Sequence, residues 1–284
     1  MATATRLRDA LIGDGYCHIR GVAPPTLIRQ IREFADDAAD RLSEEQKQRT
    51  PFQGSMISIY DHEELLPILV LPPALEALRA MGFAAPKLSS GFIISKPPEH
   101  QPPLFWHQDG ILWDDPTSYT DQPVQVFLMY YLVDTSRQNG CLRVIPGSHR
   151  HRHRHRLHEL PPAHGEEMKQ VGEAHPALQP DDDEVDVPVQ AGDLVIGDAR
   201  LLHSAHPNRS TQRRTVITLW FVPQFDELPE HLQAFYGKDA DGEPRGRPPG
   251  WSDAGWAALR QVLAHYDGPL TRPEEIRTPD ARLR

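Results

Sequence analysis

Cysteine is scarce in this sequence. Its 284 residues include only Cys17 and Cys141, and no Cys-x-x-Cys pair occurs. Two cysteines cannot build the framework of several disulfides that holds small secreted domains together. We therefore expect a protein kept reduced inside the cell, in the cytoplasm.

Long apolar runs and an excess of positive charge are also missing. The longest apolar run, near residues 65–71, contains Pro67 and is far shorter than the about 20 residues that cross a bilayer. Residues 1–20 show no apolar signal-peptide core. The net charge is −10, whereas nucleic acids and anionic membranes select basic surfaces. We expect neither as a partner, but a small-molecule substrate bound by a monomer or a homodimer.

Enough apolar material is present for a core, because hydrophobic residues make up 39% of the chain. The polar stretch 44–54 is expected to be a loop, and a short strand is expected at 16–19. Apolar residues at helical spacing predict helices over 5–12, 24–43, 72–81 and 251–266.

From residue 88 onward, short alternating runs are separated by Pro, Gly, Asn and Asp. This pattern predicts strands over 88–95, 103–107, 124–133, 142–145, 186–189, 193–196 and 216–221. Many short strands after a helical start predict an α+β, mostly β chain with a jelly-roll, cupin-like core and N-terminal supporting helices. No linker divides the sequence. We expect a single domain over 1–284, with its core at about 9–225 and a C-terminal extension at about 237–284.

His107 and Asp109 form the first pattern that indicates chemistry. They stand two positions apart, and residues two apart in an extended strand point to the same side. An imidazole and a carboxylate facing one point suit a divalent metal of intermediate softness such as Fe(II). A surface histidine followed by a turn aspartate is the alternative interpretation.

A second pattern lies at residues 200–214. It offers a third ligand, His203 or His206, and a cationic pair, Arg213 and Arg214. Two neutral histidines and one carboxylate make up the facial triad of non-haem Fe(II) oxygenases, which leaves coordination positions open. An arginine can bind the carboxylate of a co-substrate through two hydrogen bonds. Strand alternation sends Arg213 and Arg214 to opposite faces, so only one of them can do so.

Taken together, the sequence resembles the phytanoyl-CoA dioxygenase family of Fe(II)/2-oxoglutarate oxygenases. The resemblance covers most of residues 9–225, and the ordered set of motifs is specific although each motif is weak. The matching motifs are Asp14-Gly15-Tyr16, Ser95-Lys96-Pro97-Pro98, Trp106-His107-Gln108-Asp109, Asn139-Gly140-Cys141, Pro146-Gly147-Ser148-His149, Gly192-Asp193-Leu194, His203, Asn208, Ser210 and Arg214.

The resemblance implies a double-stranded β-helix with a metal at one mouth. It maps the iron ligands onto His107, Asp109 and His203. It maps the residue that clamps 2-oxoglutarate onto Arg214. The family implies that O2 then reacts at the iron, giving succinate, CO2 and a hydroxylated substrate.

The resemblance also favours His203 over His206 as the third ligand. The family's ligand precedes the asparagine by five positions, which fits Asn208, and precedes the arginine by eleven, which fits Arg214. Eleven positions after His206 stands Ile217, which cannot bind a carboxylate.

Two further residues are expected to border the 2-oxoglutarate site by the same resemblance. Lys96 occupies the family's Lys-Pro position, with a solvated lysine as the alternative. Trp113 matches an aromatic lining position in some relatives, with ordinary packing as the alternative. Because Asp109 is retained where related halogenases carry a small residue, the resemblance favours hydroxylation over halogenation.

Other interpretations remain at this point. A cupin-like metal enzyme of another kind would share the three ligands without needing Arg214 or Lys96, and a degenerate binding protein would lack turnover.

The His/Arg run at 149–156 falls at the start of a predicted insertion, 150–185, and is expected to be a solvated loop. Some large side chains could either line a substrate pocket or pack in the core, and the sequence is equally compatible with both. They are Met56, Ile57, Tyr60, Phe92, Trp106, Trp113, Tyr130 and Trp220.

Overall fold

Two antiparallel sheets form the centre of the protein in the computed structural model, which describes residues 2–100, 102–150, 155–159, 171–172 and 174–275. The major sheet has six described strands in the order β1-β7-β4-β9-β3-β2 and the minor sheet has three in the order β6-β5-β8. The major-sheet strands are β1 (Tyr16–Ile19), β2 (Ser55–Ser58), β3 (Lys87–Lys96), β4 (Val126–Tyr131), β7 (Leu194–Asp198) and β9 (Arg214–Val222). The minor-sheet strands are β5 (Leu142–Val144), β6 (Val185–Val187) and β8 (His203–Ala205).

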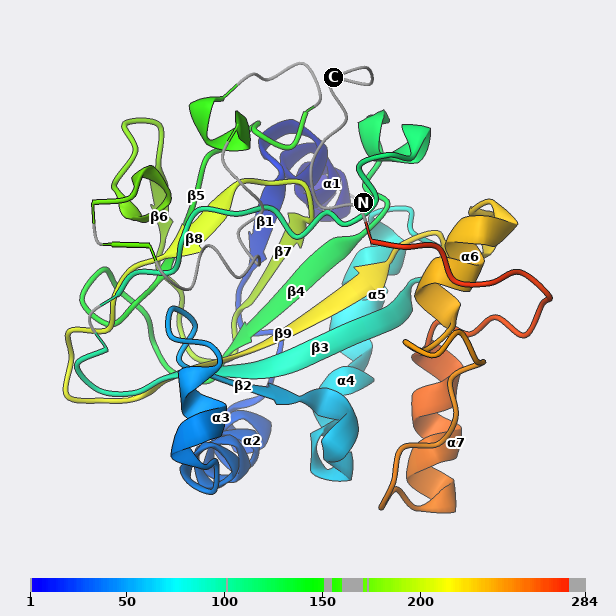
Figure 1. The fold of residues 1–284 in the computed structure, drawn as a ribbon, viewed down its shortest axis with the longest axis horizontal. Helices are drawn as coiled ribbons and strands as arrows, with labels where there is room; N and C mark the ends of the chain where they lie inside the picture. The colour runs from blue at the N-terminus through cyan, green and yellow to red at the C-terminus, as the bar shows by residue number, and fades with distance from the viewer. Residues whose placement is uncertain (1, 101, 151–154, 160–170, 173, 276–284) are drawn as a thin grey trace.

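Alternation along β4 shows how the major sheet is used on both faces. Leu128 and Tyr130 pack in the larger core on the side of the helices. Phe127, Met129 and Tyr131 point the other way, into a smaller core shared with β5 of the minor sheet. Because successive side chains of a strand alternate between faces, one strand supplies both cores. Figure 1 shows β5, β6 and β8 on one side of the long strands and α2, α3 and α4 on the other.

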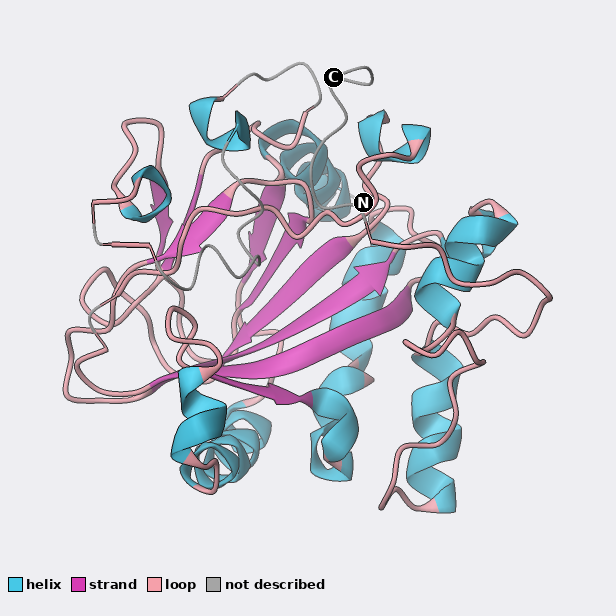
Figure 2. Cartoon of the chain, in the orientation of Figure 1, coloured by secondary structure: helices cyan, strands magenta, loops and turns pink. Residues whose placement is uncertain are grey.

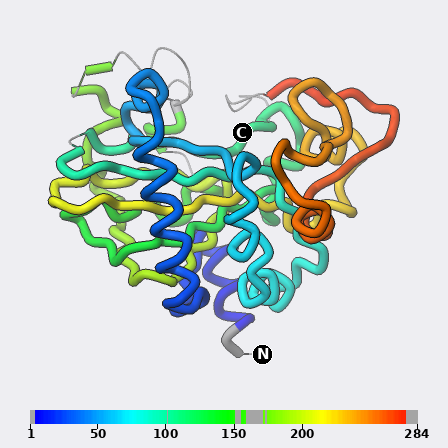
Figure 3. The backbone as a smooth tube through the Cα atoms, turned by 90° about the horizontal axis from the view of Figure 1, so that it is seen from below, coloured from blue at the N-terminus to red at the C-terminus, as the bar shows by residue number. Residues whose placement is uncertain are grey.

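Helices cover the outer face of the major sheet. Pro25 opens α2, whose apolar residues Ile28, Ile31 and Ala35 are buried in the larger core. Seen from below in Figure 3, α2, α4, α5 and α7 lie side by side across that face. The helices are α1 (Ala2–Asp14), α2 (Pro25–Asp40), α3 (Glu44–Gln48), α4 (Leu66–Leu69), α5 (Pro72–Ala80), α6 (Glu230–Gly237) and α7 (Asp253–Val262). Short 3-10 turns lie at Ile59–Asp61, Glu63–Leu65, Pro116–Tyr119, Arg156–Glu159, Pro176–Leu178 and Phe225–Glu227.

The α+β class, the N-terminal helices and most of the strands are confirmed, but several local expectations are wrong. Residues 44–48 form helix α3 instead of a loop, because Ser43 and Gln46 make a reciprocal capping box. Residues 103–107 are not a strand: this segment runs beside β8 and is joined to it by the His107–His203 bridge and by one hydrogen bond from the Leu104 N–H to the Ala205 carbonyl. Helix α7 is shorter than the predicted 251–266.

The remaining outcomes concern side chains that the sequence left open. Ile57 and Tyr130 belong to the core on the helix side, so packing is the correct interpretation for both. Cys17 and Cys141 are buried and form no disulfide. His149 is buried, with its Nε2 3.0 Å from the carbonyl oxygen of Ile12, whereas residues 151–154 of the His/Arg run and 160–170 of the predicted insertion lie outside the described residues.

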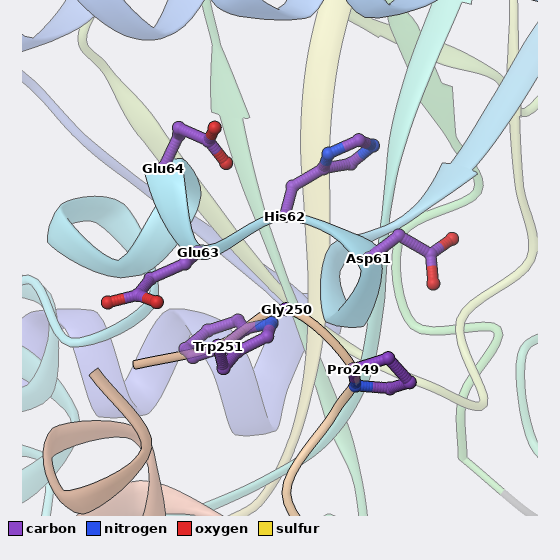
Figure 4. A pocket seen from close by; sticks show the side chains of 7 residues that line it. All are labelled: Asp61, His62, Glu63, Glu64, Pro249, Gly250 and Trp251. Carbon is purple, nitrogen blue, oxygen red and sulfur yellow. The ribbon is translucent and has the colours of Figure 1, made fainter. Parts of the chain in front are cut away.

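A surface cleft of about 450 Å³ lies where the N-terminal helical layer meets the C-terminal segment. It is lined by residues 61–64 and 249–251, and Figure 4 shows Glu63 beside Trp251. Glu63 accepts hydrogen bonds from the backbone N–H and the hydroxyl of Ser252, at 2.5 and 2.6 Å. The carboxylate is thereby engaged in holding the first turn of α7.

Among the residues that the structure describes, the helices are too short or too polar to span a bilayer.

Candidate metal centre and its buried cations

Three side chains converge between the two sheets: His107, Asp109 and His203. One ligand atom of each lies within 4.8 Å of the other two. The Nε2 atom of His107 is 3.5 Å from Asp109 Oδ1, and the Nε2 atom of His203 is 3.6 Å from Asp109 Oδ2. All three residues are buried. Donor atoms at these separations surround one point without closing hydrogen bonds to one another.

Backbone pairing explains why the two imidazoles meet. His107 and His203 exchange N–H to carbonyl hydrogen bonds of 3.0 Å in both directions. Such directly opposed residues project their side chains to the same side, and their ring centroids are 4.1 Å apart. The narrow bridge at residues 103–107, which is not a full strand, is therefore sufficient to position the site.

Each imidazole is oriented in the same local way. His107 Nδ1 lies 2.9 Å from the carbonyl oxygen of Phe105, and His203 Nδ1 lies 3.0 Å from that of Leu201. A carbonyl can only accept, so Nδ1 carries the proton in both neutral rings and the Nε2 lone pair faces Asp109. Two neutral imidazoles and one carboxylate are the donor set that Fe(II) takes in facial-triad sites, so these residues fit the metal.

The Asp109 carboxylate receives its hydrogen bond from the major sheet. The indole Nε1 of Trp220, on β9, donates to Asp109 Oδ2 over 2.8 Å. The Trp220 ring meets Phe92 of β3 edge to face, with centroids 6.0 Å apart. The ring of Phe127 on β4 packs against the ring of His203, with centroids 4.9 Å apart. The inner face of the major sheet therefore contacts two of the three converging residues.

A pair of buried cations lies further along the same face. Lys96 ends β3 and Arg214 begins β9, and the two are register partners in the sheet. Lys96 is fully buried and Arg214 is 3% exposed. The Lys96 ammonium donates to the carbonyl oxygens of His206 and Pro102, at 3.0 and 3.4 Å. Arg214 Nε has no hydrogen-bond partner among the described residues.

Burial disfavours the positive charge of both Lys96 and Arg214. It lowers the pKa of Lys96 well below its ordinary value of 10.5, and the charges of Arg214 and Arg143 lower it further. Burial lowers the pKa of Arg214 as well. Charged groups out of water are costly unless they are paired. A carboxylate, such as one end of 2-oxoglutarate, would supply the partner that Arg214 Nε lacks among the described residues.

The path from the cations to the histidines follows β4. Tyr131 lies close enough to Arg214 to act on its charge, and Phe127, which contacts His203, stands four residues earlier on the same strand. Four residues of strand span about 13 Å, so the cations and the three donors lie along one face of the major sheet.

The alternatives that the sequence left open occupy other positions. His206 Nε2 lies 2.6 Å from Asp186, in a group separate from the converging three. Arg213 is on the opposite face of β9, as alternation predicts, where it binds Asp40 and the backbone of α2. Trp113, four residues after Asp109, packs over Gly110 and against Tyr119. Its expected place beside 2-oxoglutarate stays a prediction.

Trp220 is a site residue whose contact with Asp109 sequence reasoning missed. Trp220 was a candidate pocket wall, and nothing in the sequence linked it to Asp109. The available signal was alternation: counting in twos from Arg214 along β9 reaches Trp220, which predicts that both side chains share the inner face.

Comparison with known proteins places the chain in a family. The model of the phytanoyl-CoA dioxygenase (PhyH) family matches residues 12–216. Phytanoyl-CoA dioxygenase domain-containing protein 1 of Mus musculus is 27% identical over 164 residues, 57% of this chain and 54% of the mouse protein. The protein of the same name from Rattus norvegicus is 26% identical over 163 residues. The matched region spans about half the length of these curated relatives.

Solved structures share the fold at low sequence identity. The non-haem alpha-ketoglutarate-dependent epimerase SnoN from nogalamycin biosynthesis is 19% identical, with a TM-score of 0.56 over 89% of this chain and 97% of that one. EvdO2 from Micromonospora carbonacea var. aurantiaca, solved with 2-oxoglutarate, is 23% identical, with a TM-score of 0.54 over 76% and 89%. These similarities confirm the double-stranded β-helix fold. With the family model covering most of the sequence, the chain belongs to the phytanoyl-CoA dioxygenase family of Fe(II)/2-oxoglutarate-dependent oxygenases.

Proposed function

We propose that this chain is a dioxygenase that hydroxylates an unactivated C–H bond of a small-molecule substrate, with Fe(II) held by His107, Asp109 and His203. The observation that carries the proposal is the convergence of these three donors on the same sheet face as two buried cations. Iron and 2-oxoglutarate, when bound, supply the oxidising chemistry: 2-oxoglutarate, O2 and R–H give succinate, CO2 and R–OH.

The residues of the chain have separate roles in this proposal. His107 and His203 present neutral Nε2 atoms, because backbone carbonyls hold their Nδ1 protons. Arg214 and Lys96 bind the far carboxylate of 2-oxoglutarate and thereby set its direction in the site. A cupin-like hydrolase or isomerase would need the three donors but not the buried cations, so Lys96 and Arg214 favour the oxygenase over that alternative.

The substrate is proposed to be uncharged and largely apolar where it meets the sheet. Several residues on the inner face of β2, β3 and β9 are only partly buried, and none of these carries a charge: Met56, Ser58, Ser90, Phe92, Ile94 and Trp220. Partly exposed apolar side chains beside a reactive centre indicate a binding wall for an apolar ligand. A secondary metabolite or a lipid-like acid with its charge held away from this wall fits the surface better than a free amino acid.

The proposal is tested by turnover. The purified chain with Fe(II), 2-oxoglutarate and ¹⁸O2 is offered a panel of apolar small molecules, and products are followed by mass spectrometry. Hydroxylation adds one ¹⁸O atom to the substrate and releases one succinate for each product, and Asp109→Ala abolishes both. A product of unchanged mass, as in an epimerisation, or succinate-independent turnover contradicts hydroxylation.

A further inference from the structure

Asp109 differs from its two neighbours in how it is held. Both imidazoles are oriented by a carbonyl two residues earlier in their own segment. Asp109 lies after the bridge, outside any described strand. The hydrogen bond that it accepts comes from 111 residues further along the chain, from the Trp220 indole at 2.8 Å. The direction of its carboxylate therefore depends on the major sheet.

Trp220 is itself fixed on three sides. Its backbone carbonyl accepts a hydrogen bond from the Ser89 hydroxyl at 3.0 Å. Its register partners are Ser90 on β3 and Phe127 on β4, and the ring of Phe92 meets it edge to face. An indole has one donor and no acceptor, so this ring can serve only as a fixed N–H aimed at one carboxylate oxygen.

From this geometry we infer that Trp220 is a positioning residue for the metal site: its N–H sets the rotation of the Asp109 carboxylate and so the affinity for a divalent ion. The inference rests on the proposed function, in which Asp109 is a ligand. Hydrogen-bonding partners of metal ligands commonly change metal affinity by about 10- to 100-fold. Because Trp220 stands on the same strand as Arg214, β9 would then position both the metal ligand and the co-substrate clamp.

The test measures Co(II) binding to the purified full-length chain, by calorimetry and by the visible absorption of the bound ion. Trp220→Phe keeps an aromatic ring and removes the N–H, and we expect it to bind Co(II) about 10-fold more weakly or worse, with an altered visible spectrum. Trp220→His restores a ring N–H and should recover part of the affinity. Trp251→Phe is the matched control, because it removes a buried indole N–H that donates to the Tyr60 carbonyl at 2.9 Å, and it should bind as the wild type does.

The outcomes separate this inference from the proposed function. If Trp220→Phe binds Co(II) as tightly as the wild type while Asp109→Ala binds weakly, the positioning role is wrong and the triad stands. If Asp109→Ala also binds as the wild type does, the triad is wrong and the role of Trp220 falls with it. If Trp220→Phe does not fold, Trp220→His and Trp220→Gln are compared with the wild type, and weak binding by both variants despite their N–H donors contradicts the inference.

Discussion

Single buried cations are of two kinds, those with a counter-charge within the chain and those without one among the described residues. Arg143 is buried against Glu184 at 2.9 Å and Arg200 against Asp198 at 2.7 Å, so each has its counter-charge within the chain. Lys96 is equally buried, but the charged groups that act on it are arginines. A buried cation without an anion has a cost that binding of an external anion removes. The two kinds of site cannot be told apart in the sequence, because both are basic residues in β-like segments.

The role of Arg214 is tested by removing its guanidinium. Arg214→Ala should raise the KM for 2-oxoglutarate by about 10- to 150-fold, the value of a charge-assisted hydrogen bond of about 1.5–3 kcal/mol. The matched control is Arg213→Ala, on the opposite face of β9, which should leave that KM unchanged. A normal KM in Arg214→Ala would assign the clamp to another residue.

Lys96 should have opposite effects on stability and on binding. Lys96→Met keeps much of the side-chain volume and removes the buried charge together with its hydrogen bonds to the His206 and Pro102 carbonyls. We expect removal of the buried charge to be the larger effect, so the free energy of unfolding of the apo-protein should rise by about 1 kcal/mol. Affinity for 2-oxoglutarate should fall at the same time. Urea unfolding and calorimetric titration measure the two quantities, and a variant that is both less stable and unchanged in binding contradicts the account.

The same residue predicts a pH dependence. Because the pKa of Lys96 is lowered from 10.5 in the folded chain, the unfolded chain binds more protons between the lowered value and 10.5. Stability of the apo-protein attributable to this group therefore rises with pH across that window. The difference in Tm between Lys96→Met and the wild type should shrink as the pH is raised from 7 to 10, and a difference that grows would contradict this.

The element that brings the cations together is the turn between β8 and β9. Asn208, fully buried, donates from Nδ2 to the carbonyl oxygens of Lys96, Pro97 and Gln212, at 3.3, 2.9 and 2.7 Å. Its Oδ1 accepts from the backbone and the hydroxyl of Ser210. One side chain thus ties the end of β3 to the start of β9.

Loss of this amide should disturb fold and site together. Asn208→Ala leaves buried carbonyls without donors, which should cost about 1–3 kcal/mol of unfolding free energy and weaken 2-oxoglutarate binding by loosening Lys96 relative to Arg214. Urea unfolding and titration measure the two effects. The control is Arg209→Ala, which changes the exposed neighbouring residue. If Asn208→Ala binds 2-oxoglutarate with wild-type affinity, the turn does not position the cations.

The sequence predicted the long elements and the short strands β1, β5 and β6, but it did not predict β2, α3 or β8. The alternation in 88–95 and 216–221 is regular, and both became strands of the predicted kind, β3 and β9. Strand β8 has three residues, too few to show a period, and residues 103–107 look like a strand although only Leu104 and His107 hydrogen-bond to β8 through the backbone. Whether such a segment pairs is decided by its neighbour in space. The spacing of His107 and Asp109 gave only a weak pattern, and the choice of His203 as the third ligand came from the resemblance to the family. The structure brings the three side chains together.

At the scale of the molecule, the C-terminal segment is part of the main core. In the C-terminal extension predicted from about residue 237, Trp251, Leu259 and Val262 pack in the same core as α2 and β3. Apolar periodicity predicted a helix there and gave no information about what the helix covers. The Trp251 indole donates to the Tyr60 carbonyl, which ties this segment to the N-terminal layer.

Removal of the Trp251 side chain should destabilise the whole protein. Trp251→Ala should lower the free energy of unfolding by about 3–5 kcal/mol, as expected for a large buried aromatic residue. Trp256→Ala, in the same segment but only partly buried, is the control and should cost less. Urea unfolding followed by circular dichroism measures both, and equal small losses would show that α7 adds little to the core.

The central claim is that His107, Asp109 and His203 hold an iron to which 2-oxoglutarate binds. The most direct test is an anaerobic titration of the apo-protein with Fe(II) and then with 2-oxoglutarate, followed by visible absorption. A charge-transfer band from iron to the keto acid should appear in the wild type and be absent in Asp109→Ala. Iron binding without a band in the wild type, or a full band in Asp109→Ala, would contradict the account.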